Sequence, residues 1–432
     1  MKYHRIQSTL FVKNRAKFTK ALEPNSVAFF NSNDIYPISA DSTIAFQQHR
    51  DIFYLSGVDQ EESILVIYPD AFNPVHREML FLKETSETIA IWEGEKLSKD
   101  GALQTSGIKS VFWLSQFETV LKTIMAQADN VYINTNEHTR RYSETETRED
   151  RFVKRLQRDF PVHTYKKSAP IMHRLRSVKE KEELELMQMA CDITAKGFQR
   201  VLNFVKPDVW EYEIEAEIIH EFTRNRSKGF AYTPIIGSGK SACVLHYIEN
   251  NKQCKSGDVI LMDFASEYAN YASDLTRCVP VNGKFTKRQR AVYDAVLRVK
   301  NAATKLLVPG VFLNEYHTEV GKFMEKELLG LKLIDKNDIK KQDPNWPAYK
   351  KYFMHGTSHF LGLDTHDVGL WTEPIKAGMV FTVEPGIYIQ EEGLGIRLED
   401  NVVIQKKGEP FNLMRNIPIE ADHIESLMNK RK

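Results

Sequence analysis

The sequence lacks the marks of three broad classes of protein. No stretch approaches the roughly 18 consecutive apolar residues that a membrane-spanning helix needs. The four cysteines contain no C-x-x-C pair, which argues against a zinc ribbon and against a disulfide scaffold. Lys and Arg number 59 against 58 Asp and Glu, so the net charge is only +1 and no strong field for capturing nucleic acid is expected. We therefore expect neither a membrane nor a nucleic acid as a partner.

The start of the chain also lacks a secretory signal. The segment Met1-Lys2-Tyr3-His4-Arg5-Ile6-Gln7 has no apolar core and no small-residue cleavage site. We accordingly expect a cytoplasmic protein. With 432 residues, the chain is long enough for two or three domains.

The first part of the chain mixes short β-rich runs with helical stretches. The spacing of apolar residues predicts a helix over residues 114–128, because Phe117, Val120, Leu121 and Ile124 share one helical face. The polar run 144–151 reads as a solvated loop or helix start. We therefore predict an α/β domain with a mixed sheet over residues 1–167. Its buried strands are expected at 27–30, 64–68, 79–82 and 131–133.

The pattern changes after Ser168-Ala169-Pro170, and from there the same order of elements occurs twice. Ser177 and Glu180 have the spacing of a capping box, which predicts that a long helix begins after Ser177. Two helices and a pair of strands, repeated once, indicate a duplicated architecture over residues 168–432. The expected helices end near 207 and 227 and then span 286–307 and 314–329; the expected strands span 259–264, 271–281, 379–383 and 395–404.

Four carboxylates stand in or beside the apolar strand runs of this second part: Asp263, Asp274, Glu384 and Glu399. A buried carboxylate is costly unless a positive charge compensates for it. An arginine salt bridge would explain any one of them, but only Arg277 and Arg397 lie in these strand segments. Two divalent cations would instead supply +4 against −4, and paired metals held by carboxylates are a recurrent hydrolytic device.

Histidines accompany this carboxylate set. His355, His359 and His366 fall within 12 residues, and His246 precedes the first pair of strands. Each alone is more often a structural residue than a ligand. His355 and His359 have the i, i+4 spacing of a helical zinc motif, but Gly356 and the missing Glu break that motif. The histidines indicate a metal site only in combination with the four carboxylates.

Taken together, these segments resemble the pita-bread dinuclear metallopeptidases, in particular the aminopeptidase P (Xaa-Pro aminopeptidase) group. The resemblance is close over residues 170–432 and looser before that, through Asn33-Asp34-Ile-Tyr36 and Phe53-Tyr-Leu-Ser-Gly57. It implies an α+β pita-bread catalytic domain made of duplicated helix-helix-strand-strand units. The matching segments are 236–239, 245–247, 262–263, 273–277, 354–359, 363–367, 383–388 and 395–400.

The resemblance also implies the site and its chemistry. It makes Asp263, Asp274, His359, Glu384 and Glu399 the ligands of two divalent metal ions. The donor types favour Mn²⁺, with Co²⁺ or Zn²⁺ as alternatives. It gives catalytic roles to His246, His366 and Glu384, and substrate-binding roles to His246, His355, His366, Arg397 and Tyr388. The implied reaction is hydrolysis, by metal-activated hydroxide, of the bond between an N-terminal residue and a following proline.

For the first domain, the resemblance implies a role in oligomerisation and in closing an active site. We expect a homodimer or homotetramer, with Asp34 and Trp92 in segments that match the family. Two alternatives stay open: a prolidase, which cleaves only Xaa-Pro dipeptides, and a pita-bread module that binds peptides without catalysis.

Overall fold

The computed structural model describes residues 2–430 and shows two compact units. The first comprises residues 5–176, and the second comprises the chain from Ser177 onward with its first few residues. The division lies later than the predicted residue 167, because helix α7 (Ala169–Ser177) belongs with the first unit. Arg176 of α7 ion-pairs with Asp51 at 2.9 Å, and both side chains are largely buried.

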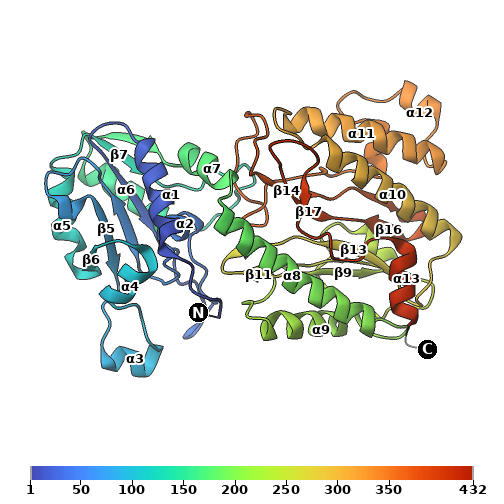
Figure 1. The fold of residues 1–432 in the computed structure, drawn as a ribbon, viewed down its shortest axis with the longest axis horizontal. Coiled ribbons are helices and arrows are strands. Elements are labelled where there is room, and N and C mark those ends of the chain that lie inside the picture. The colour runs from blue at the N-terminus through green and yellow to red at the C-terminus, as the bar shows by residue number, and fades with distance from the viewer. Residues whose placement is uncertain (1, 431–432) are drawn as a thin grey trace. The chain divides into compact units, whose positions relative to one another are not determined.

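The first unit has the predicted mixed sheet, with six strands (Figure 1). Strand β4 is antiparallel to both of its neighbours, and the other adjacent strands are parallel. The four predicted strands are confirmed as β1, β4, β5 and β7. In spatial order, the strands are β6 (Ser110–Trp113), β5 (Glu78–Leu82), β4 (Ile64–Ile67), β1 (Ser26–Asn31), β7 (Asn130–Ile133) and β8 (Thr164–Lys167).

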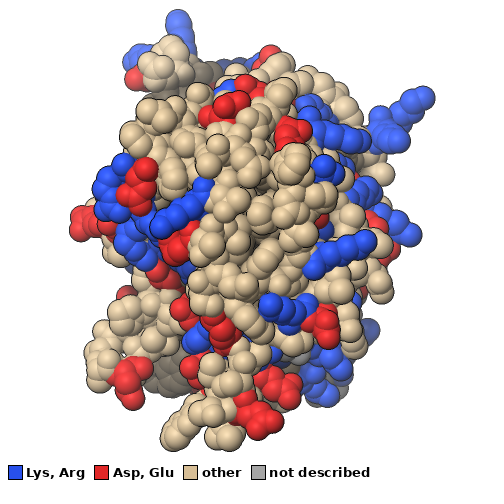
Figure 2. Space-filling model, turned by 90° about the vertical axis from the view of Figure 1, so that its left-hand side faces the viewer, with Lys and Arg blue, Asp and Glu red and all other residues tan. Residues whose placement is uncertain are grey.

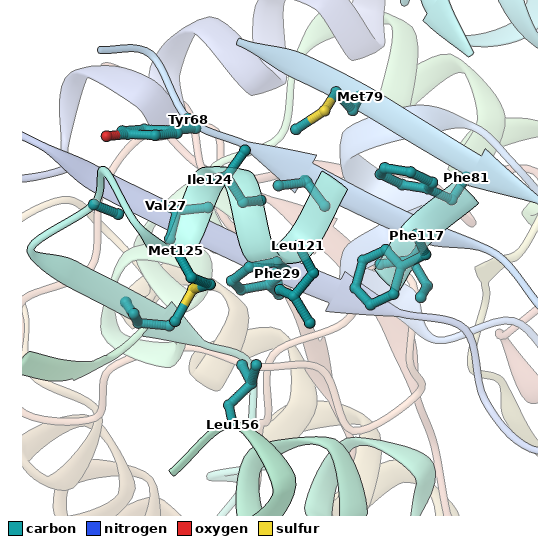
Figure 3. Close-up of a cluster of buried hydrophobic side chains, with 14 of the residues drawn as sticks. Val27, Phe29, Tyr68, Met79, Phe81, Phe117, Leu121, Ile124, Met125 and Leu156 are labelled. Carbon is teal, nitrogen blue, oxygen red and sulfur yellow. The ribbon is translucent and has the colours of Figure 1, made fainter. Parts of the chain in front are cut away.

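Helices cover both faces of this sheet, which is why every residue of β1 is buried. Val27 and Phe29 join a core with the helix α5 (Phe117–Met125), as Figure 3 shows. Phe30, on the opposite face of β1, packs edge-on against Phe18. The other helices are α1 (Ser8–Lys20), α2 (Arg50–Ser56), α3 (Glu87–Glu93), α4 (Lys99–Ser106) and α6 (Arg148–Asp159); a short hairpin is formed by β2 (Pro37–Ser39) and β3 (Ser42–Thr43).

The second unit confirms the predicted repetition of two helices followed by strands. Figure 1 shows strands between the helix pair α8–α9 and the pair α10–α11. The first half contains α8 (Lys181–Phe204), α9 (Glu211–Arg224), β9 (Ile235–Ser238), β10 (Val259–Asp263), β11 (Glu267–Tyr268), β12 (Tyr271–Ala272) and β13 (Thr276–Pro280). The second half contains α10 (Lys287–Leu306), α11 (Leu313–Gly330), α12 (Lys336–Lys340), β14 (Val380–Val383), β15 (Gly386–Ile389), β16 (Leu394–Arg397), β17 (Asp400–Val403), β18 (Phe411–Asn412) and α13 (Ala421–Asn429).

The prediction that α8 is capped by Ser177 is wrong. Ser177 is the last residue of α7, and α8 begins at Lys181. The Glu180 backbone N–H donates instead to the Glu183 carboxylate, at 2.8 Å. A capping box therefore exists, but three residues further along the chain than the pattern indicated.

Two predicted strands are interrupted, and each interruption carries a site carboxylate. The stretch 271–281 divides into β12 and β13 around Asp274, and the stretch 395–404 divides into β16 and β17 around Glu399. The Asn401 side chain accepts from the Asp274 N–H (3.0 Å) and donates to the Asp274 carbonyl (2.7 Å). A side chain thus satisfies backbone groups that a regular ladder would otherwise pair.

Two further observations concern the apolar character of the helices and the charge of the surface. Across the part of the chain that the structure describes, no helix combines the length and apolar character that a bilayer-spanning segment needs. On the face shown in Figure 2, Lys and Arg are interspersed with Asp and Glu around surface without charge.

Candidate active site

The five predicted ligands come from both halves of the second unit. Asp263 is the last residue of β10, and Asp274 lies just before β13. His359 lies in the loop before β14, Glu384 directly follows β14, and Glu399 lies between β16 and β17. These positions at strand ends place polar side chains next to an otherwise apolar core.

Three of the five form a compact group suited to a metal ion. Asp274, His359 and Glu399 are buried, and one ligand atom from each lies within 4.8 Å of the others. His359 Nε2 lies 3.4 Å from Asp274 Oδ2 and 3.7 Å from Glu384 Oε1. The Glu399 Oε1 atom is buried and has no hydrogen-bond partner. A buried anionic oxygen without a donor fits a cation as its missing partner.

The orientation of His359 also suits metal ligation. Its Nδ1 lies 2.9 Å from the Phe360 carbonyl oxygen, which can only accept, so Nδ1 carries the proton. Nε2 therefore faces Asp274 and Glu384 and is the ring nitrogen placed to bind a metal ion. Metal-binding histidines are commonly fixed by such a bond from the other ring nitrogen.

The carboxylates are poorly compensated by protein charge. Burial, together with the other site carboxylates, raises the pKa of Asp274, Glu384 and Glu399 well above its ordinary value. Arg277, one of the two strand arginines, ion-pairs with Asp400 at 2.6 Å and donates to the backbone carbonyl of Glu399, not to its carboxylate. Within residues 2–430, the one arginine ion pair to this set joins Arg397 and Asp263. The excess negative charge fits bound divalent cations.

Asp263 differs from the compact group because both of its oxygens have partners. Tyr232 donates to Oδ1 at 2.5 Å, and Arg397 Nη2 donates to Oδ2 at 2.5 Å. Burial and the Asp263 charge raise the pKa of Tyr232 well above its ordinary value, so this phenol stays a donor. Sequence reasoning missed Tyr232, which lies before β9 with no apolar pattern to mark it.

Arg397 connects the carboxylates to the predicted substrate-binding residues. Its Nη1 donates to the Tyr388 hydroxyl, at 2.8 Å, and its Nε donates to Thr276 Oγ1, at 3.0 Å. Thr276 in turn donates to Glu399 Oε2 at 2.7 Å. Thr276 is a second residue that the sequence did not single out; its pairing with Asp263 across β10 and β13 places it here.

His355 is held in a neutral form beside this network. Its Nδ1 lies 2.8 Å from the Gly356 carbonyl oxygen, and its Nε2 lies 2.8 Å from the Tyr388 hydroxyl. Burial first, then the Arg397 charge, lowers the pKa of His355 to about 3. Nδ1–H therefore donates to the carbonyl, and Nε2 accepts from Tyr388.

The remaining two predicted residues lie at the exposed side of the site. The His366 ring is edge-on to the His359 ring, with centroids 4.4 Å apart. His246 is exposed, in a turn after the 3-10 helix η3 (Gly239–Cys243), and its charge contributes to the lowered pKa of His355. The structure thus gathers all the predicted site residues in the second unit.

A duplicated α+β unit with a buried carboxylate–histidine centre defines the class of the pita-bread metallopeptidases. The family model for metallopeptidase family M24 matches residues 185–406, and the model for the N-terminal domain of aminopeptidase P matches residues 11–132. The chain belongs to metallopeptidase family M24, and it is an enzyme of the metallo-exopeptidase class.

Curated and solved relatives agree with this assignment. The Xaa-Pro aminopeptidase of Escherichia coli is 33% identical over 97% of both chains, and human Xaa-Pro aminopeptidase 3 is 30% identical over 92% of this chain and 80% of its own length. A structure described as a putative aminopeptidase P from Bacillus anthracis superposes with a TM-score of 0.92 at 31% identity, covering 99% of each chain. A zinc-substituted E. coli aminopeptidase P in complex with product gives a TM-score of 0.87 at 32% identity, covering 98% of this chain and 99% of that chain.

Proposed function

We propose that this enzyme is an Xaa-Pro aminopeptidase, which hydrolyses the bond between an N-terminal residue and a following proline. The single observation that carries the proposal is the buried group of Asp274, His359 and Glu399, with Glu399 Oε1 lacking any hydrogen-bond partner. Relatives that bear the Xaa-Pro aminopeptidase name over nearly the whole chain support the choice of substrate.

Two divalent ions are the proposed cofactor, held by Asp263, Asp274, His359, Glu384 and Glu399. Four carboxylates and one imidazole favour Mn²⁺, with Co²⁺ and Zn²⁺ as alternatives. Such a pair supplies Lewis acidity and a water of lowered pKa. The raised pKa of Asp274, Glu384 and Glu399 supports a site that is built for added positive charge.

The proposed catalytic residues are His246, His366 and Glu384. Glu384, whose pKa is raised by burial and by Glu399, can accept a proton from water and pass it to the leaving proline nitrogen. His366, exposed beside His359, can donate to the oxygen on which charge develops. His246 is exposed as well, and its charge acts on His355.

The proposed substrate-binding residues are His246, His355, His366, Arg397 and Tyr388. The bonds from Arg397 to Tyr388 and from Tyr388 to His355 fix three of these side chains against one another. A preorganised wall of this kind can select the compact, N–H-free proline ring by shape. Peptides with proline in second position are therefore the proposed partners.

We also propose that the chain assembles as a homodimer or homotetramer, in which the N-terminal domain (residues 1–167) closes an active site in residues 168–432. Trp92 is 85% exposed, which suits a contact made on assembly, whereas Asp34 is anchored to Arg151 at 2.5 Å. Light scattering coupled to gel filtration tests this; a monomer at assay concentration would contradict it.

The four cysteines, all unpaired and buried, suit the reducing cytoplasm as the proposed location, which cell fractionation tests.

A peptide series with metal-stripped and reloaded enzyme tests the function. We expect cleavage of Ala-Pro-Ala and longer Xaa-Pro peptides after Mn²⁺ is restored, and none of Ala-Ala-Ala. Cleavage of Ala-Pro alone would favour the prolidase alternative. Binding of Ala-Pro-Ala with no product, whichever of Mn²⁺, Co²⁺ or Zn²⁺ is supplied, would favour the non-catalytic module.

A further inference from the structure

The first unit contains a cavity that lies outside the proposed active site. Its volume is about 320 Å³, near the lower end of the range for small-molecule sites, roughly 300–1,000 Å³. It is lined by Asn31, Ile64, Leu114, Phe117, Glu118, Arg148, Arg151, Phe152 and Arg155.

The cavity lies at the edge of the six-stranded sheet where most strands end. Strands β1, β7 and β8 run in one direction, and β5 and β6 share it, because β4 is antiparallel to both β1 and β5. Asn31 is the last residue of β1, and Leu114 directly follows β6. In open α/β sheets, ligands bind in the crevice outside the carboxyl ends of the strands.

Three arginines of α6 form one wall. Arg148, Arg151 and Arg155 follow one another at steps of three and four, so they share a helical face. Arg151 is neutralised by Asp34 at 2.5 Å, and Arg155 donates to Glu118 at 2.8 Å. Protein carboxylates therefore satisfy two of the three guanidinium groups.

Arg148 is the third, and among residues 2–430 its guanidinium forms no ion pair. Its Nη1 donates to Ser32 Oγ at 2.9 Å, which leaves further N–H donors of the planar fork. The neighbouring Glu149 faces Asn31 instead, and burial raises its pKa to about 8, so it adds little negative charge at neutral pH. The Arg148 guanidinium thus has no direct carboxylate partner, although the charges of Glu62 and Asp34 act on it and Asp34 accepts from its backbone N–H at 2.8 Å.

Four apolar side chains also line the cavity, and one of them, Phe152, lies on α6 beside the arginines. The four are Ile64, Leu114, Phe117 and Phe152, and the two phenylalanine rings lie with their centroids 6.1 Å apart. Phe117, shown in Figure 3, also belongs to the core formed with α5, so this apolar lining is rigidly supported. A ligand here would place a compact apolar group against these residues, next to the arginines of α6.

We propose that this cavity binds a small apolar monocarboxylate, with the carboxylate on Arg148 and the apolar group on Phe117 and Phe152. Arginine suits this role because its fork matches a carboxylate bidentately. Phosphate alone lacks the apolar part, and a neutral alcohol lacks the charge. The site is independent of the metal centre and of the proposed peptidase activity.

Titration of the metal-free full chain with 3-phenylpropionate, followed by calorimetry and ligand-observed NMR, tests the proposal. We expect binding to the wild type, at least about tenfold weaker binding to Arg148→Gln, and no comparable binding of 3-phenylpropanol or inorganic phosphate. Arg158→Gln is the matched control, because Arg158 lies on the same helix, is exposed and does not line the cavity. Leu114→Glu, which places a carboxylate in the cavity, is expected to abolish binding as well.

The circular dichroism of each variant reports whether it folds. If Arg148→Gln fails to fold, Leu114→Glu carries the test. Undetectable binding to the wild type, equal binding to a folded Arg148→Gln, or equal binding of the alcohol would each overturn the proposal. Equal binding of phosphate would identify a general anion site and would overturn the assignment of an apolar carboxylate.

Discussion

Arg397 Nη2 lies 2.5 Å from Asp263 Oδ2, and the side chains of both residues are largely buried. The pair joins the two halves of the second unit, since Asp263 ends β10 and Arg397 ends β16. Burial disfavours the charged arginine, but Tyr388, Asp263 and the other site carboxylates outweigh it and raise the pKa of Arg397 above its ordinary value. Arg397 thus stays charged in the site.

Arg397→Met is expected to destabilise the metal-free second unit by about 3–5 kcal/mol, because it leaves Asp263 buried without its cation. Hydrogen exchange of the β10 and β16 amides measures this. The control is Arg298→Met, which removes an exposed arginine from its pair with Glu327 and should cost about 0–1 kcal/mol. Added Mn²⁺ is expected to reduce the difference in stability between Arg397→Met and the wild type, because a bound cation would compensate the Asp263 charge. If the β10 and β16 amides are equally protected in metal-free Arg397→Met and metal-free Arg298→Met, the prediction is wrong.

Replacing the proposed metal ligand Asp274 or Glu399 by its amide is expected to abolish both activity and two-metal occupancy. Asp274→Asn and Glu399→Gln keep the side-chain shape and remove buried like charges, so the metal-free protein should remain folded. Metal content by mass spectrometry and Xaa-Pro hydrolysis are the measurements. Glu409→Gln, at an exposed position, is the control: it makes the same charge change as Glu399→Gln and should alter neither the metal content nor the hydrolysis rate. Retained turnover in a site variant would refute its assignment as a ligand.

His366→Ala is expected to lower kcat by a factor of about 100 or more, the scale on which an oxyanion donor or a proton-transfer group acts. The His366 ring contacts His359, so metal content must be measured alongside the rate. If kcat falls while the metal content stays full, His366 has a catalytic role. If metal is lost, His366 acts by holding His359 in position. His423→Ala, at an exposed position in α13, serves as the control.

Local patterns in the sequence were enough to predict most of the fold and to single out the carboxylates and histidines proposed for the site, whereas Tyr388 was proposed from the resemblance alone. Periodicity identified β10 and α10 to within a residue of their bounds. Carboxylates inside apolar runs are costly enough to signal a site from sequence alone, as with Asp263 and Glu384. Resemblance then supplied roles for residues that were already conspicuous.

The parts that could not be predicted depend on contacts between distant segments. Tyr232, Thr276 and Asn401 are ordinary residues in sequence, and their positions follow from the pairing of strands and from bonds to Asp263, Glu399 and Asp274. The break in the strand at Asp274 has the same origin, since the Asn401 side chain replaces a ladder partner there. The cavity at Arg148 could not be predicted either, because the polar sequence at the start of α6 is typical of a solvated loop or helix start.

Glu149 is a buried acid in the first unit, next to Arg148, and it is not one of the proposed metal ligands. Its two oxygens accept from the Asn31 backbone N–H at 2.8 Å and from the Asn31 side chain at 2.9 Å. Burial nevertheless dominates and raises its pKa to about 8. The folded chain therefore holds this proton over a pH range in which the unfolded chain has lost it.

The stability of the first unit is consequently expected to fall as the pH rises from about 4.5 to about 8, because the unfolded state binds fewer protons there. The limiting slope is about 1.4 kcal/mol per pH unit for one group. Glu149→Gln, which cannot ionise, should lose this part of the pH dependence. Hydrogen exchange of the β1 amides at about pH 5.5 and pH 8, corrected for intrinsic rates, measures the difference from the wild type. Glu144→Gln, at an exposed position, is the control and should follow the wild type. If the β1 amides of Glu149→Gln are protected as in the wild type at both pH values, Glu149 does not cause the pH dependence.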